Sequence, residues 1–342
     1  MTATSNSAPL TKKDFKSDQD VRWCPGCGDY GILNAVQSAF AKLGKNLHDT
    51  VVISGIGCSS RFPYYMETYG FHTIHGRAPA FATGVKTANP ALDVWVVTGD
   101  GDSLSIGGNH FIHSLRRNVG LKILLFNNRI YGLTKGQYSP TSEAGKTTKS
   151  SPMGSVDYPM RPVNLALGAG ATFVARSIDT YGSHLEEIIT LAAGHEGTAL
   201  VEVYQNCNIF NDGAFDSFRD KAVRADRTVN LEHGKPLLFG AENDKGLRFD
   251  ADMRPEVITI GENGVTIDDV IVWDESDESP ARAMALASMS EERFPVPIGV
   301  FRNTVRPAFE LAVNAQINAA KEKRGEQDLQ TLLDGPDTWE VG

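Results

Sequence analysis

DVWVVTGDGDSLSIGGNHFIHSLRRNVGLKILLFNNRIYGLTKGQ, residues 93–137, decides the fold of this chain. Two short apolar runs, 94–97 and 123–126, suit strands that are buried on both faces. Between them apolar residues recur at helical spacing, and each run ends in a polar turn. The segment therefore predicts a strand–helix–strand unit of a parallel sheet. Ligands of such sheets bind outside the carboxyl ends of the strands.

The two polar turns carry the groups that a phosphate and a magnesium ion need. The glycines of GDGD (99–102) let the backbone approach a phosphate, and the helix that follows offers free N–H groups to an anion. Asp100 and Asn128 add hard oxygen ligands at the ends of the two strands, and Mg²⁺ takes its remaining ligands from phosphate and water. The alternative is an ordinary Asp-Gly turn and an Asn-terminated strand without a ligand. The combination of GDGD with Asn-Asn at the distance of one crossover favours the ligand site.

Composition excludes several classes of protein. The chain has 342 residues, enough for one large domain or two smaller ones, and a net charge of −9, which argues against a nucleic-acid binder. No apolar run approaches the roughly 18 residues of a membrane span. The first 20 residues are polar and lack the apolar stretch of a signal peptide. We expect a cytoplasmic protein that binds neither nucleic acid nor membrane.

The four cysteines, Cys24, Cys27, Cys58 and Cys207, all lie in polar turns. Cys-Pro-Gly-Cys is a tight turn that can point two thiolates at one centre. Cys58 and Cys207 each follow a strand-like run, so both would emerge at the same edge of a parallel sheet. Four thiolates suit Zn²⁺ or a [4Fe–4S] cluster. A redox dithiol or chance would also explain Cys-x-x-Cys, and spacing alone does not separate zinc from iron and sulfur.

Several motifs together resemble the β subunit of 2-oxoacid:ferredoxin oxidoreductases, and most closely that of the 2-oxoglutarate enzymes. The resemblance covers residues 21–212. It rests on WCPGCGDYG (23–31), SGIGCSSRFPYY (54–65), HTIHGRAPAFATG (72–84), GDGDSLSIGGNH (99–110) and NNRIYGLTKGQYSPTS (127–142).

The resemblance implies an α/β fold with a doubly wound, mostly parallel sheet of the thiamine diphosphate-binding type. It also implies thiamine diphosphate, Mg²⁺ and a [4Fe–4S] cluster as cofactors. Cys24, Cys27 and Cys58 match the family's cluster motifs, and Cys207 is taken as the fourth ligand from its position. Asp100, Asn128 and the backbone carbonyl of Ile130 would hold Mg²⁺. The residues expected to line thiamine diphosphate are Gly57, Cys58, Ser59, His75, Gly76, Arg77, Gly101, Asp102, Gly132 and Leu133.

Two residues are candidates for the reaction itself. His75 would contact the diphosphate or the thiazolium region, or stabilise charge on a bound intermediate. Arg61 could form a bidentate contact with a substrate carboxylate. The simpler alternatives are a hydrogen-bonding histidine in a turn and an arginine in a surface ion pair.

The implied activity is the CoA-dependent oxidative decarboxylation of 2-oxoglutarate to succinyl-CoA and CO₂, or the reverse carboxylation. Electrons would pass through the cluster to ferredoxin. Thiamine diphosphate needs a glutamate from a pyrimidine-binding domain, for which this chain has no room, so an α subunit is an expected partner. Ferredoxin would dock on the α subunit or on a basic patch of Arg22, Arg219, Lys221 and Arg224.

Other functions remain open. Pyruvate or a broad range of 2-oxoacids could be the substrate. The chain could also belong to a non-redox thiamine-dependent decarboxylase or synthase with a Cys₄ zinc site. A third reading is an iron–sulfur electron-transfer subunit whose thiamine signature no longer binds the cofactor.

Three regions are expected: a polar lead-in over 1–20, mobile until residue 21; the cofactor-binding domain over 21–212; and a C-terminal extension over 213–342 that packs on the core or on a partner. In the domain, 198–204 reads as the last main strand, and the polar stretch 138–159 is either a cover for the active site or a surface loop. In the extension, 236–240 and 257–274 read as β pieces with a hairpin turn at 262–264, and 280–290 and 304–324 read as helices.

Overall fold

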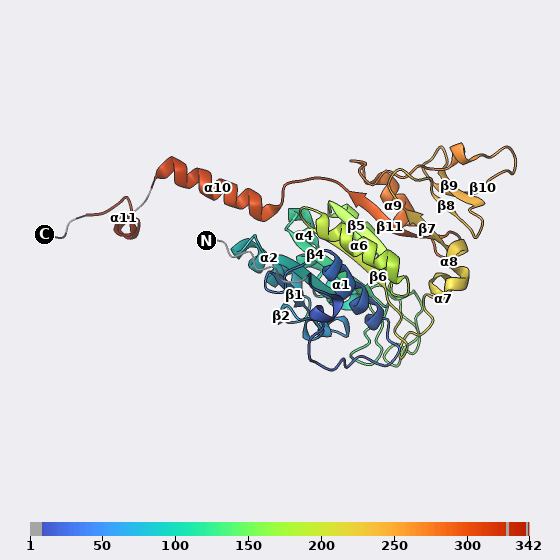
Figure 1. Cartoon of the computed structure of the whole chain (residues 1–342), viewed down its shortest axis with the longest axis horizontal. Helices are drawn as coiled ribbons and strands as arrows, with labels where there is room; N and C mark the ends of the chain where they lie inside the picture. Colours follow the sequence, from blue (N-terminus) through green and yellow to red (C-terminus); the bar gives the residue numbers. More distant parts are fainter. Residues whose placement is uncertain (1–8, 326–327, 340, 342) are drawn as a thin grey trace.

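The centre of the chain is an eight-stranded, mostly parallel sheet in the order β2-β1-β3-β4-β6-β5-β11-β7 (Figure 1). This computed structural model describes residues 9–325, 328–339 and 341. The strands are β1 (Thr50–Ser54), β2 (Tyr69–His72), β3 (Asp93–Gly99), β4 (Leu121–Asn127), β5 (Phe173–Ile178), β6 (Ala199–Tyr204), β7 (Thr228–Leu231) and β11 (Val296–Asn303). Only the pairing of β11 with β5 is antiparallel. The predicted doubly wound, mostly parallel sheet is confirmed.

Helices cover both faces of this sheet (Figure 1). Successive residues of a strand point to opposite faces of the sheet. In β3, Val94 and Val96 belong to the apolar core on one face and Trp95 and Val97 to the apolar core on the other, so both faces need covering helices. One face packs against α1 (Asp29–Lys42) and α6 (Gly182–Gly194). The other packs against α2 (Ala78–Ala88), α4 (Gly108–Arg117), α5 (Pro162–Gly168) and α9 (Ala281–Ala287), with the short α3 (Asp100–Leu104) at the end of β3.

The lead-in is more ordered than the sequence predicted. Residues 1–8 lie outside the described residues, but from there the chain forms the 3₁₀ helix η1 (Lys12–Phe15). Phe15 is fully buried and meets Phe40 of α1 edge to face, with ring centroids 5.8 Å apart. For residues 9–20 the expectation of a mobile segment is wrong, because Phe15 anchors this part of the chain in the core.

The expectation that 198–204 is the last main strand is also wrong. β7 and β11, both from the C-terminal region, extend the sheet beyond β5. β11 escaped prediction because Pro297 and Gly299 interrupt its apolar pattern and a register shift follows at Val300. Gly299 has φ of +99°, and a Cβ there would lie 2.5 Å from the Leu231 carbonyl oxygen, so this position needs glycine.

The rest of the C-terminal region forms a small sheet of β8 (Leu238–Phe239), β9 (Lys245–Phe249) and β10 (Pro255–Thr259). β10 pairs with β9 before it, so the predicted hairpin at 262–264 is wrong. That segment makes a turn, closed by a hydrogen bond from Gly261 N to the Val265 carbonyl, and leads to the 3₁₀ helix η3 (Ile267–Asp269).

The predicted C-terminal helices are present with shorter limits. They are α9 and α10 (Phe309–Arg324), and α10 and the short α11 (Leu329–Asp334) extend away from the body of the molecule (Figure 1). The helices α7 (Asp216–Arg219) and α8 (Lys221–Arg227) precede β7. In the ranges that the structure describes, no helix has both the length and the apolar character to span a membrane.

Candidate functional site

The predicted site residues follow the carboxyl ends of neighbouring strands. Residues 57–59 follow β1, 75–77 follow β2, 100–102 follow β3 and 128–133 follow β4. These four strands are adjacent and parallel, so their ends lie along one edge of the sheet. The structure thereby brings together turns that are as much as 76 positions apart in the sequence (133 − 57).

Asp102 connects three of these turns. Its Oδ1 accepts hydrogen bonds from the backbone N–H of Ile56 at 3.0 Å and of Gly76 at 2.7 Å. Its Oδ2 accepts a hydrogen bond from the Thr98 hydroxyl at 2.8 Å. The side chain is 1% exposed. Asp102 therefore holds together the turns that are predicted to line the cofactor.

His75 also lies against Asp102. Its Nδ1 is 2.8 Å from Oδ1 of Asp102, with the geometry of an ion pair and not of an aligned hydrogen bond. The imidazole ring meets the Tyr131 ring at 6.4 Å between centroids. The Asp102 carboxylate thus contacts both His75 Nδ1 and the Gly76 N–H, and these two contacts orient the turn that carries His75.

The His75–Gly76–Arg77 turn packs tightly on the loop after α3. Gly76 has φ of +69°, and a Cβ there would lie 2.5 Å from the backbone nitrogen of Gly107. Arg77 donates a hydrogen bond to the Ile106 carbonyl at 3.0 Å. The backbone approach at Gly76 explains why a glycine stands in this turn.

Asp100, the predicted magnesium ligand, is buried at the end of β3. Its Oδ2 accepts hydrogen bonds from the hydroxyls of Ser139 at 2.5 Å and Thr141 at 2.7 Å. Burial raises the pKa of this carboxyl, and the two hydroxyls act in the opposite direction. A divalent cation would remove the cost of burying the negative charge.

Asn128 and Ile130, the other two predicted magnesium ligands, lie at the end of the neighbouring β4. The Asn128 amide donates a hydrogen bond to Gln205 Oε1 at 3.0 Å, and its Oδ1 accepts one from Ile130 N at 3.2 Å. The structure thus places Asn128 and Asp100 on adjacent strand ends, with the side chain of each hydrogen-bonded to protein groups. The turn continues into Tyr131, whose hydroxyl donates to the Gly101 carbonyl at 3.1 Å.

The four cysteines line one cavity of about 220 Å³. Cys24 and Cys27 come from the turn before α1, Cys58 from the end of β1 and Cys207 from the end of β6. A Cβ added to Gly132 would lie 3.5 Å from the sulfur of Cys58 and 3.6 Å from that of Cys207. In the described ranges, no three His, Cys, Asp or Glu side chains converge as ligands of a single ion. The four cysteines instead surround a cavity that is larger than the site of a single ion.

Burial and a nearby carboxyl group determine the protonation of two of these thiols. Burial raises the pKa of Cys27, and burial together with Asp29 raises the pKa of Cys58 to about 12. Asp29 lies buried behind Cys27, and burial, with Asp179 nearby, raises its own pKa to about 7. Without a bound cation the Cys27 and Cys58 thiols are therefore neutral, whereas thiols that coordinate a metal are deprotonated.

Hydrogen bonds from other residues of the cavity and from the segment behind it hold the cysteine turns. Trp23 Nε1 donates to the Cys58 carbonyl at 2.6 Å, and Gln205 Nε2 lies 3.4 Å from the Cys27 sulfur. Buried Asp179 accepts from the Asn206 N–H, next to Cys207, at 2.9 Å.

Two arginines of the predicted ferredoxin patch have other roles. Arg219 Nε lies 2.7 Å from Asp179 Oδ1, with its side chain 21% exposed. Arg224 donates to the Arg219 carbonyl at 2.7 Å and lies over the Tyr181 ring. Both side chains thus have contacts within the chain, at the segment behind Cys207, and the basic patch for ferredoxin stays a prediction.

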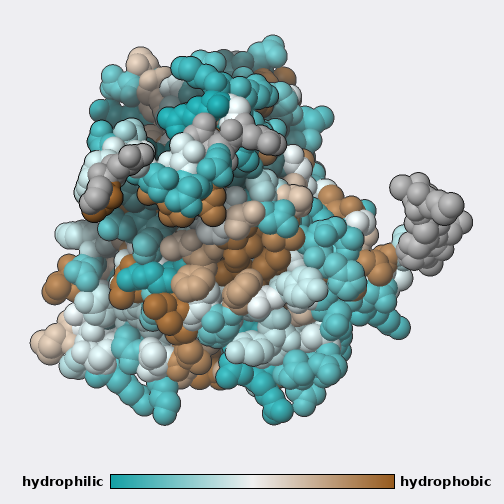
Figure 2. Space-filling view, turned by 90° about the vertical axis from the view of Figure 1, so that its left-hand side faces the viewer, coloured by the Kyte–Doolittle hydropathy of each residue, from teal (hydrophilic) through white to brown (hydrophobic). Residues whose placement is uncertain are grey.

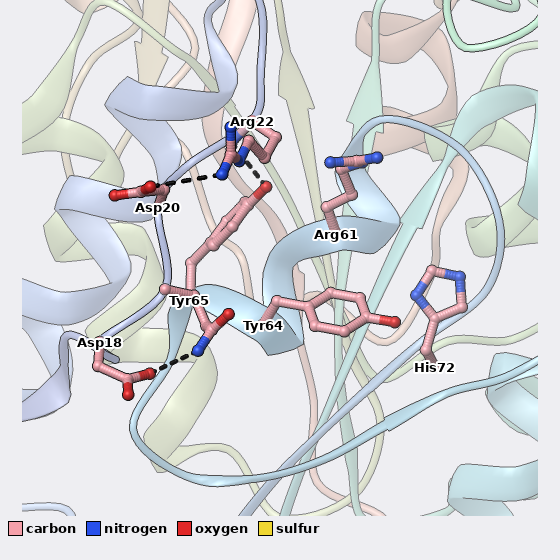
Figure 3. A pocket seen from close by; sticks show the side chains of 8 residues that line it. Asp18, Asp20, Arg22, Arg61, Tyr64, Tyr65 and His72 are labelled. Atoms are coloured by element: carbon pink, nitrogen blue, oxygen red, sulfur yellow. Dashed lines mark hydrogen bonds and ion pairs between the residues drawn. The ribbon is translucent and has the colours of Figure 1, made fainter.

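A second cavity, of about 420 Å³, adjoins the cysteine cavity (Figure 3). Arg22 and Arg61 line both, so they stand between them. Arg22 pairs with Asp20 at 3.4 Å. The Arg61 guanidinium has no dashed contact to the other residues drawn in Figure 3, and Tyr64 and His72 line the same space. Arg61 is the residue of this cavity best suited to receive an anion.

Sequence reasoning missed the residues that hold Asp100. Ser139, Thr141 and Ser142 open the stretch 138–159 and are buried, whereas Met153, Val156 and Tyr158 further along are strongly exposed. The first part of this stretch is thus neither a cover nor a surface loop but a support beneath Asp100. The signal was present in the hydroxyl-rich run SPTS at 139–142, which follows directly on the Asn128 turn.

Comparison with known proteins agrees with this geometry. Residues 55–203 match the family model of the C-terminal TPP-binding domain of thiamine pyrophosphate enzymes. The chain is 54% identical to the 2-oxoglutarate oxidoreductase subunit KorB of Mycobacterium tuberculosis over 97% of this chain and 89% of that protein. It is 41% identical to the 2-oxoacid:ferredoxin oxidoreductase 1 subunit beta of Aeropyrum pernix, over 82% of this chain and 76% of the relative.

A solved structure with the same fold is the 2-oxoglutarate:ferredoxin oxidoreductase from Magnetococcus marinus, with 2-oxoglutarate, coenzyme A and succinyl-CoA bound. The two chains superpose with a TM-score of 0.75 at 34% identity, over 97% of this chain and 98% of the other.

The sheet, its ligand edge and these matches define a thiamine pyrophosphate-binding domain of the α/β class. More particularly, the chain belongs to the family of β subunits of 2-oxoacid:ferredoxin oxidoreductases, as its resemblance to that family predicted.

Proposed function

We propose that the chain is the β subunit of a thiamine diphosphate-dependent 2-oxoglutarate:ferredoxin oxidoreductase. With an α subunit it would convert 2-oxoglutarate and CoA to succinyl-CoA and CO₂, or catalyse the reverse, and exchange electrons with ferredoxin. One observation carries the proposal: a Cβ added to Gly132, in the turn expected to line thiamine diphosphate, would lie 3.5 Å from the sulfur of Cys58 and 3.6 Å from that of Cys207. A redox centre among the cysteines would therefore adjoin the thiamine site.

Cys24, Cys27, Cys58 and Cys207 would hold a [4Fe–4S] cluster. The cavity that they line has a volume of about 220 Å³, which exceeds what one metal ion occupies. Four thiolates are the usual ligands of such clusters. Gly132 fits this assignment, since a side chain there would enter the space between two of the ligands. All four cysteines are free, which suits a reducing compartment and supports a cytoplasmic location.

Asp100, Asn128 and the Ile130 carbonyl would hold Mg²⁺ at the diphosphate of the cofactor. The buried Asp100 carboxylate and the strand ends beside it supply hard oxygens of the kind that Mg²⁺ prefers. Bound thiamine diphosphate supplies the electron sink for the decarboxylation of a 2-oxoacid. The protein's part is to orient it: Asp102 fixes the turns of Ile56 and Gly76, and His75 lies at the same carboxylate, where it can contact the cofactor.

Arg61 would bind the second carboxylate of 2-oxoglutarate. It lies between the cysteine cavity and the polar cavity of Figure 3, within reach of both. Arg61 and Cys58 both line the cysteine cavity. Pyruvate has no second carboxylate, so Arg61 favours 2-oxoglutarate, the compound that the Magnetococcus marinus enzyme holds.

An α subunit would complete the site. The face of the molecule that carries β2 and α2 is apolar in its centre (Figure 2). Large exposed apolar side chains of these elements and of the adjoining turns are Tyr69, Phe71, Ile74, Phe81 and Ile106. Ile74 and Ile106 flank the His75 turn, so a subunit seated there would lie at the cofactor.

Substrate selectivity tests this proposal. The complex with the α subunit, handled without oxygen, should reduce ferredoxin with 2-oxoglutarate and CoA faster than with pyruvate and CoA. Arg61→Met should raise KM for 2-oxoglutarate by about tenfold or more, the loss of one charge-assisted contact, and change KM for pyruvate little. Equal effects on both substrates would remove Arg61 from substrate recognition. A complex that decarboxylates without any electron acceptor would favour the non-redox alternative.

A further inference from the structure

The hydroxyl of Thr141 lies between two buried acceptors at the proposed metal site. Its Oγ1 is 2.7 Å from Asp100 Oδ2 and 2.9 Å from Asn127 Oδ1. Thr141, Asp100 and Asn127 are each at most 3% exposed. A threonine hydroxyl has one proton to donate, so only one of the two contacts can be its hydrogen bond at a time.

The orientation of the Asn127 amide is determined by the sheet behind it. Its Nδ2 donates to Glu202 Oε1 at 2.7 Å, and Glu202 pairs through Oε2 with Arg176 Nε at 2.7 Å. Glu202 and Arg176 are buried on the neighbouring strands β6 and β5. Because the carboxylate needs a donor, Asn127 must present its oxygen, and not its NH₂ group, to Thr141.

The Asn127 oxygen has another donor, the backbone N–H of Arg129 at 3.3 Å. The proton of Thr141 is therefore available to Asp100. Ser139 donates to the same oxygen, Oδ2, at 2.5 Å. Two donors on one carboxylate oxygen fix the rotation of the carboxylate, and with it the direction of the second oxygen, Oδ1.

We propose that Thr141, with Ser139, is a positioning residue that aims the Asp100 carboxylate at Mg²⁺. This inference rests on the proposed function, because it takes Asp100 as a metal ligand. The chain Arg176–Glu202–Asn127 fixes the orientation of the Asn127 amide from the interior of the sheet. The segment 139–142 thereby belongs to the metal site, although it lies outside GDGD and Asn-Asn, the two short sequences that mark the site.

The test is the affinity for Mg²⁺ and for thiamine diphosphate, measured by calorimetry on the complex with the α subunit after both have been removed. Thr141→Val keeps the shape and removes the hydroxyl, and it should weaken Mg²⁺ binding by about tenfold or more, as loss of a hydrogen bond to a charged group does. Thr141→Ser keeps the hydroxyl and should stay within about threefold of the natural protein. Iron content and the visible spectrum should be unchanged in both variants.

Thr147→Val is the matched control, since Thr147 lies in the same stretch but is exposed. Ser139→Ala is a second variant in case Thr141→Val does not fold, and it should weaken Mg²⁺ binding in the same direction. Natural Mg²⁺ affinity in either folded variant would overturn the positioning role. Failure of the natural complex to bind Mg²⁺ and thiamine diphosphate would overturn the proposed function itself, and this inference with it.

Discussion

Asparagine has nearly the shape of aspartate but lacks its charge. Replacement of Asp102 by asparagine should therefore weaken the hydrogen bonds that hold the turns predicted to line the cofactor. The charged carboxylate accepts two backbone N–H groups and one hydroxyl, all within 3.0 Å. A hydrogen bond to a charged acceptor contributes about 1.5–3 kcal/mol and one to a neutral acceptor about 0.5–1.5 kcal/mol. Asparagine would keep the two backbone bonds in the weaker form and reverse the contact with Thr98. We therefore expect Asp102→Asn to lower the free energy of unfolding by about 2–3 kcal/mol.

The assay is thermal unfolding of the Asp102→Asn chain, together with its affinity for thiamine diphosphate in the complex. With about 2–4 °C of Tm per kcal/mol in domains of 150–250 residues, Tm should fall by about 5 °C or more. Gly55→Ala should act in the same direction, because its Cβ would lie 1.9 Å from Asp102 Oδ2 and displace the carboxylate. Asp337→Asn, at an exposed position, is the control. An Asp102→Asn chain with the natural Tm and natural thiamine diphosphate affinity would refute the reasoning.

Three further predictions concern the cofactor groups and the core. Asp100→Ala should abolish Mg²⁺-dependent binding of thiamine diphosphate and leave iron content unchanged. Unaltered binding in this variant would remove Asp100 from the metal ligands, whereas absence of binding in the natural protein would support a thiamine signature that no longer functions. Cys207→Ser should lower the iron content and the visible absorbance of the anaerobically purified chain, and natural values for both would remove Cys207 from the ligand set. Burial lowers the pKa of His184 to about 4 from 6.5, so the unfolded chain takes up the proton first as pH falls. The contribution of His184 to the free energy of unfolding is complete above pH 6.5 and is lost between pH 6.5 and 4. In the His184→Gln variant, the free energy of unfolding measured with denaturant should therefore depend less on pH in that range.

The sequence predicted the parts of the site that are local. GDGD and Asn-Asn mark the ends of two adjacent strands, and a turn at a strand end is encoded by the residues within it. The four cysteines could be placed at one edge for the same reason, because each follows a strand or forms a tight turn. The helix over 281–287 was likewise predicted, with the limits 280–290.

Contacts between distant segments could not be predicted in this way. Asp102 looked like a cofactor-lining residue, but its partners Ile56 and Gly76 are 46 and 26 positions away, and nothing in its own turn encodes them. Thr141 reaches Asp100 across 41 positions. β11 joins the sheet through pairing with β5, and its proline and glycine conceal the strand until its neighbours are known.

The central claim is that the four-cysteine cavity holds an iron–sulfur cluster that exchanges electrons with the thiamine site beside it. Anaerobic purification with the α subunit, followed by iron analysis and by visible and EPR spectra before and after addition of 2-oxoglutarate and CoA, tests it most directly. We expect about four irons per chain, as in a [4Fe–4S] cluster, and bleaching of the visible band with a new EPR signal when 2-oxoglutarate and CoA are added. Zinc in place of iron, or a cluster that 2-oxoglutarate and CoA leave oxidised, would contradict the claim.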